Sequence, residues 1–354
     1  MAYRSLRLQS FRSYADYAVD LSGGVTIVAG PNGSGKTNLL EALYVLSTGS
    51  SFRTHDRELL QHGREWFRID GAWGDQQRVL TYRRAGDVAD KQFLIDGAKK
   101  ARLTHQQRVP VVLFEPDHLR LLRASPTSRR DYLDSLLSKL QPDFIWLKHQ
   151  FERALLQRNN VLKKRLPAYL RDDQLFAWDI KFADLAEQVV TRRQQVIAQL
   201  NARLDQVYST IAHKTSSARI TYQSTAPLTD YRAGLLRLLS ESIDRDQQRG
   251  FTGIGPQRDD FSIVLNNEPA STTASRGEMR SLLLALKMIE LNMLESRADQ
   301  QPLLLLDDVF SELDTSRRRA LAELAKAYQT IITTTDADAT RQHFGHDYAQ
   351  ITTG

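Results

Sequence analysis

Gly30-Pro31-Asn32-Gly33-Ser34-Gly35-Lys36-Thr37 matches the pattern G-x-x-x-x-G-K-[ST] at every fixed position. An apolar run at 25–29 precedes it, and an apolar helical pattern at 39–46 follows it. A glycine-rich turn between a strand and a helix lets successive backbone N–H groups surround a phosphate chain. We therefore predict a nucleoside triphosphate site, with Lys36 at the β- and γ-phosphates and the Thr37 hydroxyl on Mg²⁺. The predicted nucleotide contacts are Gly30, Pro31, Asn32, Gly33, Ser34, Gly35, Lys36, Thr37 and Asn38.

A second apolar strand ends in two adjacent carboxylates. Residues 302–306 have the sequence Pro-Leu-Leu-Leu-Leu and are followed by Asp307 and Asp308. A buried strand that brings acids to its carboxyl end, beside a phosphate-binding loop, can hold Mg²⁺ and polarise an attacking water. We predict that Asp307 shares the metal with Thr37 and that Asp308 is the catalytic residue. A strand that ends in acids only for solubility is the alternative.

Two further motifs lie in the C-terminal third of the chain. Ser275, Gly277 and Glu278 form an S-x-G-E pattern before an apolar helical segment at 282–288, and 311–314 are Ser-Glu-Leu-Asp. On its own, S-x-G-E is typical of a helix N-cap with an acid nearby. A serine there can also direct its hydroxyl and the helix N–H groups at a phosphate. The order of the four motifs resembles that of the ABC ATPase superfamily, in which the signature serine of one subunit caps the ATP held by the other.

Composition limits the cellular setting and the partner. The chain has no cysteine, which excludes disulfides and thiolate metal sites and permits a reducing cytoplasm. Because no apolar run approaches the ~20 residues of a membrane span and the N-terminus lacks a signal-peptide core, we expect a cytoplasmic protein. The net charge is +6, and residues 120–171 carry 12 Lys or Arg against 4 Asp or Glu. This basic segment indicates a polyanion partner, with a solvated helix face as the alternative.

Hydrophobic periodicity predicts how the chain is organised. Residues 67–97 contain short strand-like runs broken by Gly and Asp, which predicts an antiparallel β-subdomain. Beyond Pro126, apolar residues recur at helical spacing, which predicts a helical arm inserted into an α/β domain. The predicted fold is therefore an α/β, ABC-type P-loop ATPase domain with these two additions. The predicted parts are 1–118 with the P-loop and β-subdomain, 119–248 as the helical arm, and 249–354 as the C-terminal half of the ATPase lobe.

The chain resembles the RecF family of SMC-like ABC ATPases along almost its whole length. Residues 11–14 are similar to the family's F-R-N-Y, 255–260 to G-P-H-R-D-D, and 307–314 to D-D-V-x-S-E-L-D. Gln257 departs from the histidine of the second motif, and Arg276 departs from the glutamine of the family's S-Q-G-Q-Q-R. Further matching segments are 37–42, 51–54, 114–117, 126–130 and 157–160.

The resemblance implies an ATP-driven homodimer that binds double-stranded DNA and its junctions with single strands. It also implies a partnership with RecR and RecO that helps to load RecA at gaps, in recombinational repair, replication-fork maintenance and SOS induction. ATP and Mg²⁺ would be the ligands, and slow, DNA-dependent hydrolysis would act as a timer.

Several cations are predicted to contact DNA, because non-specific binding needs a shared basic surface. For Arg129 and Arg130, the alternative is an internal pair with Asp131, Asp134 or Asp259. For Lys163, Lys164 and Arg165, the alternative is a solvated helix end. The predicted DNA contacts are Arg53, Arg129, Arg130, Lys163, Lys164 and Arg165.

Two other functions fit part of the sequence. A soluble ATPase subunit of an ABC transporter would share the four motifs. The long separation of P-loop and signature, the basic arm and the lack of a switch histidine after 331–332 disfavour it. A nucleotide-gated protein scaffold with negligible hydrolysis also stays open, because Asp308 is one methylene shorter than the glutamate that many ABC relatives carry there.

Overall fold

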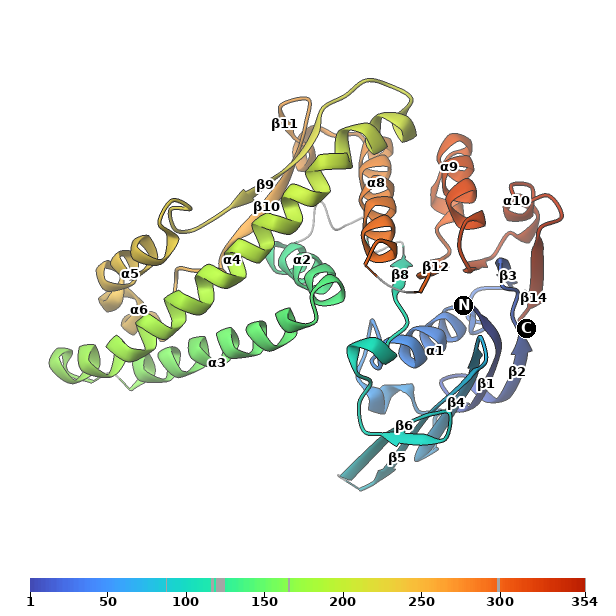
Figure 1. Cartoon of the computed structure of the whole chain (residues 1–354), viewed down its shortest axis with the longest axis horizontal. Helices are drawn as coiled ribbons and strands as arrows, with labels where there is room; N and C mark the ends of the chain where they lie inside the picture. The colour runs from blue at the N-terminus through green and yellow to red at the C-terminus, as the bar shows by residue number, and fades with distance from the viewer. Residues whose placement is uncertain (87, 116–117, 119–124, 165, 298–299, 354) are drawn as a thin grey trace. The chain divides into compact units, whose positions relative to one another are not determined.

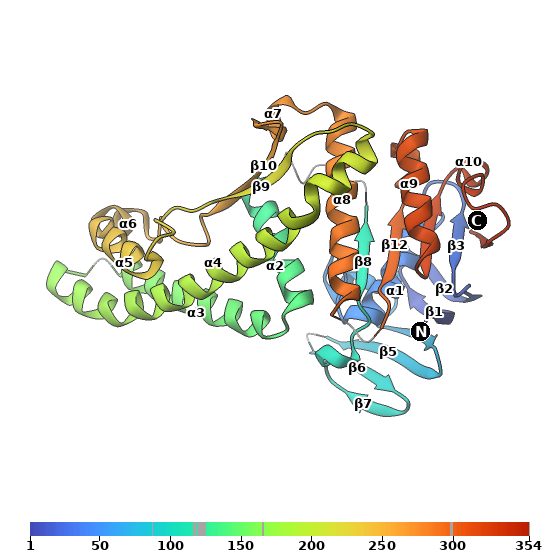
Figure 2. The ribbon, with the colours of Figure 1, turned by 45° about the horizontal axis from the view of Figure 1, so that its top comes forward.

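The computed structural model describes residues 1–86, 88–115, 118, 125–164, 166–297 and 300–353. The chain divides into two compact units, one formed by Met1–Leu119 with Glu290–Gly354 and the other by Arg120–Ile289 (Figures 1 and 2). Parallel and antiparallel sheets occur together with helices, so the predicted α/β fold class is confirmed. Among the described helices, none combines the length and apolar character that a membrane crossing requires.

A five-stranded parallel sheet forms the centre of the first unit, in the order β14-β3-β13-β12-β8. Every residue of β3 and β13 is buried, and so is β12 up to its last residue. Continuous apolar strands of this kind are typical of parallel sheets that are covered on both faces. The strands are β3 (Val25–Ala29), β8 (Val111–Phe114), β12 (Leu303–Asp307), β13 (Thr330–Thr334) and β14 (Tyr348–Thr352).

A six-stranded antiparallel sheet, in the order β2-β1-β4-β5-β6-β7, forms the predicted β-subdomain. Burial alternates along β4, as expected for strands with one covered face. Its covered face shares one hydrophobic cluster with helix α1 (Lys36–Thr48) and with strands of the parallel sheet. A Cβ at Gly71 of β4 would lie 2.6 Å from Leu46 of α1, so this glycine permits the close approach. The strands are β1 (Tyr3–Phe11), β2 (Tyr14–Asp20), β4 (Trp66–Trp73), β5 (Gln76–Ala85), β6 (Val88–Ile95) and β7 (Ala98–Lys100).

Short helices complete the first unit. Two α-helices follow the acidic end of β12, namely α9 (Thr315–Lys326) and α10 (Ala337–Arg341). Within the described residues, 3-10 helices lie at Asp56–Leu59, His105–Gln107 and Phe310–Glu312.

The second unit is built on long helices. The helices α3 and α4 run side by side as the predicted arm (Figure 1), and α4 alone has 45 residues. A three-stranded antiparallel sheet, β11-β10-β9, lies in the same unit. The helices are α2 (Pro126–Leu140), α3 (Asp143–Lys163), α4 (Ala168–Ala212), α5 (Tyr231–Glu241), α6 (Ile243–Arg249), α7 (Ala270–Thr273) and α8 (Arg276–Glu295). The strands are β9 (Ala218–Gln223), β10 (Asp260–Leu265) and β11 (Glu268–Pro269).

The boundary after the arm differs from the expected one. Residues 249–289 were expected in the ATPase lobe, yet they group with the arm. Strand pairing explains the difference. β10 pairs antiparallel with β9 over six residues, and β9 follows the arm helix α4, so the segment after residue 249 groups with the arm. Helix α8 begins in the second unit and ends in the first.

Candidate active site

The loop between β3 and α1 has a backbone suited to a phosphate. Gly33 and Gly35 have φ angles of 83° and 93°, which glycine adopts without strain. A Cβ at Gly30 would lie 2.4 Å from the carbonyl oxygen of Thr353, and one at Gly35 would lie 2.8 Å from Ser13 Oγ. Within the described chain, no side chain caps the start of α1. Its first N–H groups and helix dipole therefore favour an anion at this loop.

Lys36 lies over this loop, as the phosphate-binding pattern predicts. Its Nζ donates hydrogen bonds to the carbonyl oxygens of Gly30 and Pro31, both at 2.8 Å. The side-chain amide of Asn38 donates to Ser13 Oγ and accepts from Arg53. Asn38 therefore connects the start of α1 to the arginines beside it.

Thr37 and Asp307 lie together although 270 residues separate them. The Thr37 hydroxyl is 2.9 Å from Asp307 Oδ1 and 3.1 Å from Oδ2. Thr333 is aligned with Asp307 in the β12–β13 ladder and donates its hydroxyl to Oδ1 at 2.7 Å. Thr333 was not among the predicted site residues. Its position at the carboxyl end of an apolar parallel strand was the available signal.

Asp308 has an unusual backbone at the end of β12. Its φ of 50° lies in the left-handed region, which costs a residue with a side chain roughly 1 kcal/mol. Its backbone N–H donates to the carbonyl and hydroxyl oxygens of Thr333. Burial raises the pKa of Asp308, and the nearby Lys36 charge opposes that rise. Among the described residues, the buried Oδ1 of Asp308 has no hydrogen-bond partner.

These residues fit a magnesium ion. Hydroxyl and carboxylate oxygens are the protein ligands that Mg²⁺ prefers. Thr37 and Asp307 would hold the ion, and the unpaired Oδ1 of Asp308 could accept a hydrogen bond from a water beside it. Elsewhere in the described chain, no group of three or more His, Asp or Glu offers another metal site.

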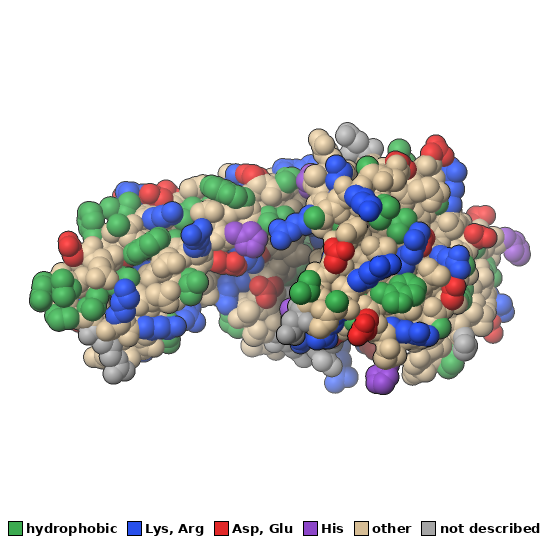
Figure 3. Space-filling model, turned by 90° about the horizontal axis from the view of Figure 1, so that it is seen from below, with side chains coloured by type: hydrophobic (Ala, Val, Ile, Leu, Met, Phe, Trp, Pro, Cys, Tyr) green, Lys and Arg blue, Asp and Glu red, His purple; other side chains and the backbone are tan. Residues whose placement is uncertain are grey.

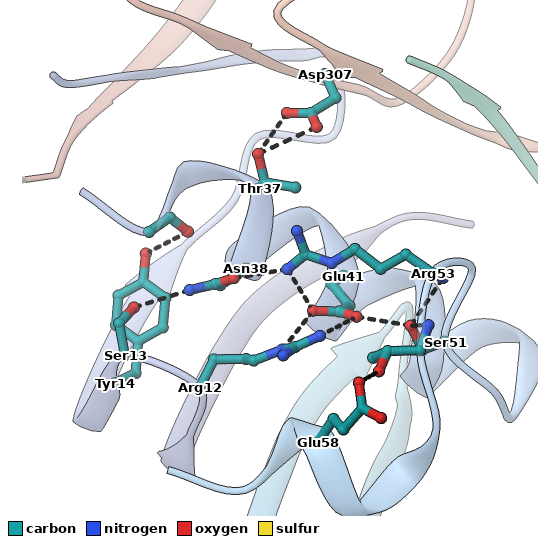
Figure 4. A network of polar contacts seen from close by, with 12 residues as sticks. Arg12, Ser13, Tyr14, Thr37, Asn38, Glu41, Ser51, Arg53, Glu58 and Asp307 are labelled. Atoms are coloured by element: carbon teal, nitrogen blue, oxygen red, sulfur yellow. Dashed lines mark hydrogen bonds and ion pairs between the residues drawn. The ribbon is translucent and has the colours of Figure 1, made fainter. Parts of the chain in front are cut away.

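A buried carboxylate supports α1 one turn beyond Thr37 (Figure 4). Glu41 is fully buried and accepts hydrogen bonds from Arg12 at 2.9 and 3.0 Å, from Arg53 at 2.6 Å and from Ser51 at 2.6 Å. Burial alone would raise the pKa of Glu41, but these donors outweigh it and lower the pKa. Glu41 and Arg12 were not predicted as site residues, because the pairing joins three separate segments of the chain.

The arginines of this network line an open pocket of about 560 Å³. Arg53, predicted to contact DNA, therefore has two internal partners, Glu41 and Asn38, while remaining partly exposed. The lining residues are Arg12, Ser13, Asn38, Arg53, Thr54, Glu58 and Leu60.

Ser275 and Glu278 form a capping box at the start of α8. Ser275 Oγ accepts from the N–H of Glu278 at 3.2 Å, and Glu278 Oε2 accepts from the N–H and the hydroxyl of Ser275, both at 2.9 Å. Gly277 lies in the first turn between them. The N-cap interpretation of S-x-G-E is therefore correct.

The Ser-Glu-Leu-Asp segment closes the loop after the acids. Ser311 donates its hydroxyl to the carbonyl oxygen of Asp308 at 2.7 Å. Asp314 caps α9 by accepting from the N–H of Arg317 at 3.0 Å. The loop that carries Asp308 is thus tied to the helix that follows it.

The predicted DNA contacts in the arm have different environments. Arg129 forms a two-bond pair with Asp260, at 2.7 and 2.5 Å, and Arg130 donates to the carbonyl oxygen of Asp259 at 2.8 Å. Lys163 and Lys164 are exposed at the end of α3. Arg165 lies outside the described residues. On the face shown in Figure 3, Lys and Arg side chains are interspersed with Asp and Glu.

Side chains of the G-P-Q-R-D-D segment, residues 255–260, form hydrogen bonds within the second unit. Asp259 accepts from Tyr222 at 2.7 Å and from the N–H and hydroxyl of Thr225 at 2.7 and 2.8 Å. Gln257 donates to the carbonyl oxygen of Ile254 at 2.8 Å. Asp259 therefore joins this segment to β9 and to the loop that follows β9.

Comparison with known proteins identifies the family. A family model described as RecF/RecN/SMC N terminal domain matches residues 3–352. A DNA replication and repair protein RecF from Heliobacterium modesticaldum is 34% identical over 348 residues, covering 96% of this chain and 94% of the relative. The chain belongs to the RecF family. The RecF of Staphylococcus haemolyticus is 31% identical over 357 residues, again covering 96% and 94%.

Solved structures of the family have the same fold. The structure of the recombination mediator protein RecF-ATPrS in the RecFOR pathway gives a TM-score of 0.86 at 27% identity, covering 99% of this chain and 95% of that chain. The corresponding RecF-ATP structure gives 0.84 at 28% identity, covering 95% and 93%. The SmcHead bound to the C-winged helix domain of ScpA, at 14% identity and a TM-score of 0.54, covers 97% and 92% and shares the fold alone.

Proposed function

We propose that this RecF-family chain is an ATP-dependent DNA-binding protein that closes into a homodimer around two ATP–Mg²⁺ ligands. The observation that carries the proposal is the contact between Thr37 and Asp307, which joins the P-loop to the acidic strand. Relatives solved with ATP and its analogue support ATP as the ligand. The dimer would bind double-stranded DNA and its junctions with single strands. With RecR and RecO it would help to load RecA at gaps, serving recombinational repair, replication-fork maintenance and SOS induction.

The chemistry would be slow, DNA-dependent ATP hydrolysis that reopens the dimer. Mg²⁺, when bound, would neutralise charge on the transferred phosphate. Lys36 would exchange its two carbonyl partners for phosphate oxygens, and Asp308 would accept a hydrogen bond from the attacking water. The Ser275 hydroxyl and the start of α8 would meet the nucleotide of the partner subunit.

A nucleotide-gated scaffold with negligible hydrolysis is the second candidate. The left-handed backbone of Asp308 favours it, because a misdirected acid orients water poorly. Asp308→Asn separates the two functions. An active enzyme would lose turnover and accumulate as an ATP-bound dimer, whereas the behaviour of a scaffold would not change.

The main test is binding of a fluorescent gapped duplex with ATP, with ADP and without nucleotide, over a range of salt. We expect tight binding only with ATP, weakening steeply as salt rises. Lys36→Ala should abolish the ATP dependence, and Ser275→Arg should bind ATP yet remain a monomer. Binding that ignores nucleotide would favour the scaffold, and no DNA binding would contradict the proposal.

The exposed lysines at the end of α3 refine the proposed DNA surface. Replacing Lys163 and Lys164 by Gln should lower the slope of log affinity against log salt by up to about 2, if both contact phosphates. Arg129→Gln is the comparison, because its guanidinium is already paired with Asp260. An unchanged slope in the double lysine variant would remove this surface from the proposal.

A further inference from the structure

A lysine beyond the end of the arm helix contacts the signature motif. Lys214 follows α4, and its Nζ lies 2.5 Å from Oε1 of Glu278. The other oxygen of Glu278 accepts from the N–H and the hydroxyl of Ser275. One carboxylate therefore joins Lys214 to the serine that is proposed to face a nucleotide.

The turn that carries Lys214 is held in place on both sides. Ser209 of α4 exchanges hydrogen bonds with the backbone of Ser216, which closes the turn onto the helix. The N–H of Ser217 donates to the Asn266 side chain at 3.1 Å, and the N–H of Asn266 returns a bond to the Ser217 carbonyl at 2.8 Å. The turn that carries Lys214 is therefore anchored to α4 on one side and to the loop before β11 on the other.

Glu278 presents an electrostatic problem for a phosphate contact. The hydrogen bond from Lys214, followed by those from Ser275, lowers the pKa of Glu278 to about 2, so the carboxylate is charged at neutral pH. A bare carboxylate beside a serine that must donate to a triphosphate would repel that ligand. It would also compete for the same hydroxyl proton, since Ser275 Oγ donates to Glu278. Lys214, on Oε1 of Glu278, reduces both the repulsion of the triphosphate and the competition for the Ser275 proton.

We propose that Lys214 is a positioning residue for the signature serine: it balances the Glu278 charge and holds the carboxylate so that Ser275 can turn to the nucleotide of a partner subunit. The inference rests on the proposed ATP-driven dimer. It means that a residue just beyond the end of α4 contributes to ATP-driven dimerisation. An ordinary exposed ion pair would instead leave dimerisation unchanged.

A double-mutant cycle on the full chain tests this role, with Lys214→Ala, Glu278→Gln and both together. We expect Lys214→Ala to weaken ATP-driven dimerisation about tenfold, measured by sedimentation. ATP affinity of the monomer, measured with a fluorescent analogue, should not change, because the P-loop is untouched. In the Glu278→Gln background, Lys214→Ala should cause no further loss of dimerisation, since the charge that Lys214 balances is already gone. Lys214→Arg should also retain dimerisation.

Lys326→Ala is the matched control, because it removes a similar exposed pair, with Glu323 at 2.8 Å, on α9. It should have no effect, and a common urea midpoint would show that all the variants fold. Parent-like dimerisation of Lys214→Ala would overturn the inference, as would a loss that persists in the Glu278→Gln background. If the parent chain stays monomeric with ATP, the proposed function fails and this inference fails with it.

Discussion

Two ion-paired carboxylates, Glu41 and Glu278, lie on helices that begin at motifs predicted to contact ATP, and the two side chains differ mainly in burial. Glu41, on the P-loop helix α1, is 0% exposed and is held by Arg12, Arg53 and Ser51. Glu278, at the signature motif, is 23% exposed and pairs with Lys214, which is 47% exposed. The same ion-pair chemistry should therefore stabilise the fold at Glu41 and adjust a functional contact at Glu278.

Removing the charge of the buried Glu41 should have the largest effect on stability. Glu41→Gln should lower the free energy of unfolding by about 3 kcal/mol, because two arginine charges lose their shared partner inside the protein. Urea denaturation with an unchanged m-value would measure this loss. A decrease below about 1 kcal/mol would mean that water solvates Arg12 and Arg53 well enough to replace the carboxylate.

The two arginines of the network should contribute unequally. Arg12→Ala should cost about 2 kcal/mol and Arg53→Ala about 1 kcal/mol, because Arg12 makes two bonds to Glu41 and is the more buried of the two. The same denaturation series measures both variants. Equal losses would indicate that the contact between Arg53 and Asn38 also supports the fold.

The exposed carboxylate should matter little for stability at pH 7. Glu278→Gln should change the free energy of unfolding by less than about 1 kcal/mol, since water and salt screen the pair. Glutamine also keeps the acceptor that the capping box needs. A loss as large as that of Glu41→Gln would contradict the comparison.

The smallest expected effect is a dependence on pH. The pKa of Glu278 is lowered in the folded chain to about 2 from an ordinary value of 4.5. Its contribution to stability is therefore complete above about pH 4.5 and is lost as the pH falls towards 2. The difference in melting temperature between the parent and Glu278→Gln should shrink between pH 6 and pH 3. A difference that grows on acidification would reverse this assignment.

Local pattern predicted the parts of the site that lie at the ends of strands and helices. The P-loop follows from its glycines and flanks, and Asp307 follows from an apolar strand that ends in acid. Because parallel strands present their carboxyl ends at one edge, the meeting of Asp307 with Thr37 needed no further information.

Other parts depend on tertiary pairing and could not be predicted from local pattern. Glu41 has no signal of its own, because its partners come from the turn after β1 and the loop after α1. Lys214 lies 64 residues from Glu278 and follows no periodicity. The arm boundary differed for the same reason, because it depends on the pairing of β10 with β9.

The unbroken length of α4 also constrains the protein in a way that no single residue reveals. At 1.5 Å per residue, its 45 residues extend about 68 Å. Arg193 inside α4 is held by Asp134 and by the carbonyl of Pro256, and Asn201 is held by the backbone of Ile220. Adding two residues between Arg193 and Lys214 would rotate the end of the helix by about 200°, whereas adding seven would nearly restore its facing. Substitutions on the exposed face of this helix should therefore be tolerated better than insertions that rotate its end.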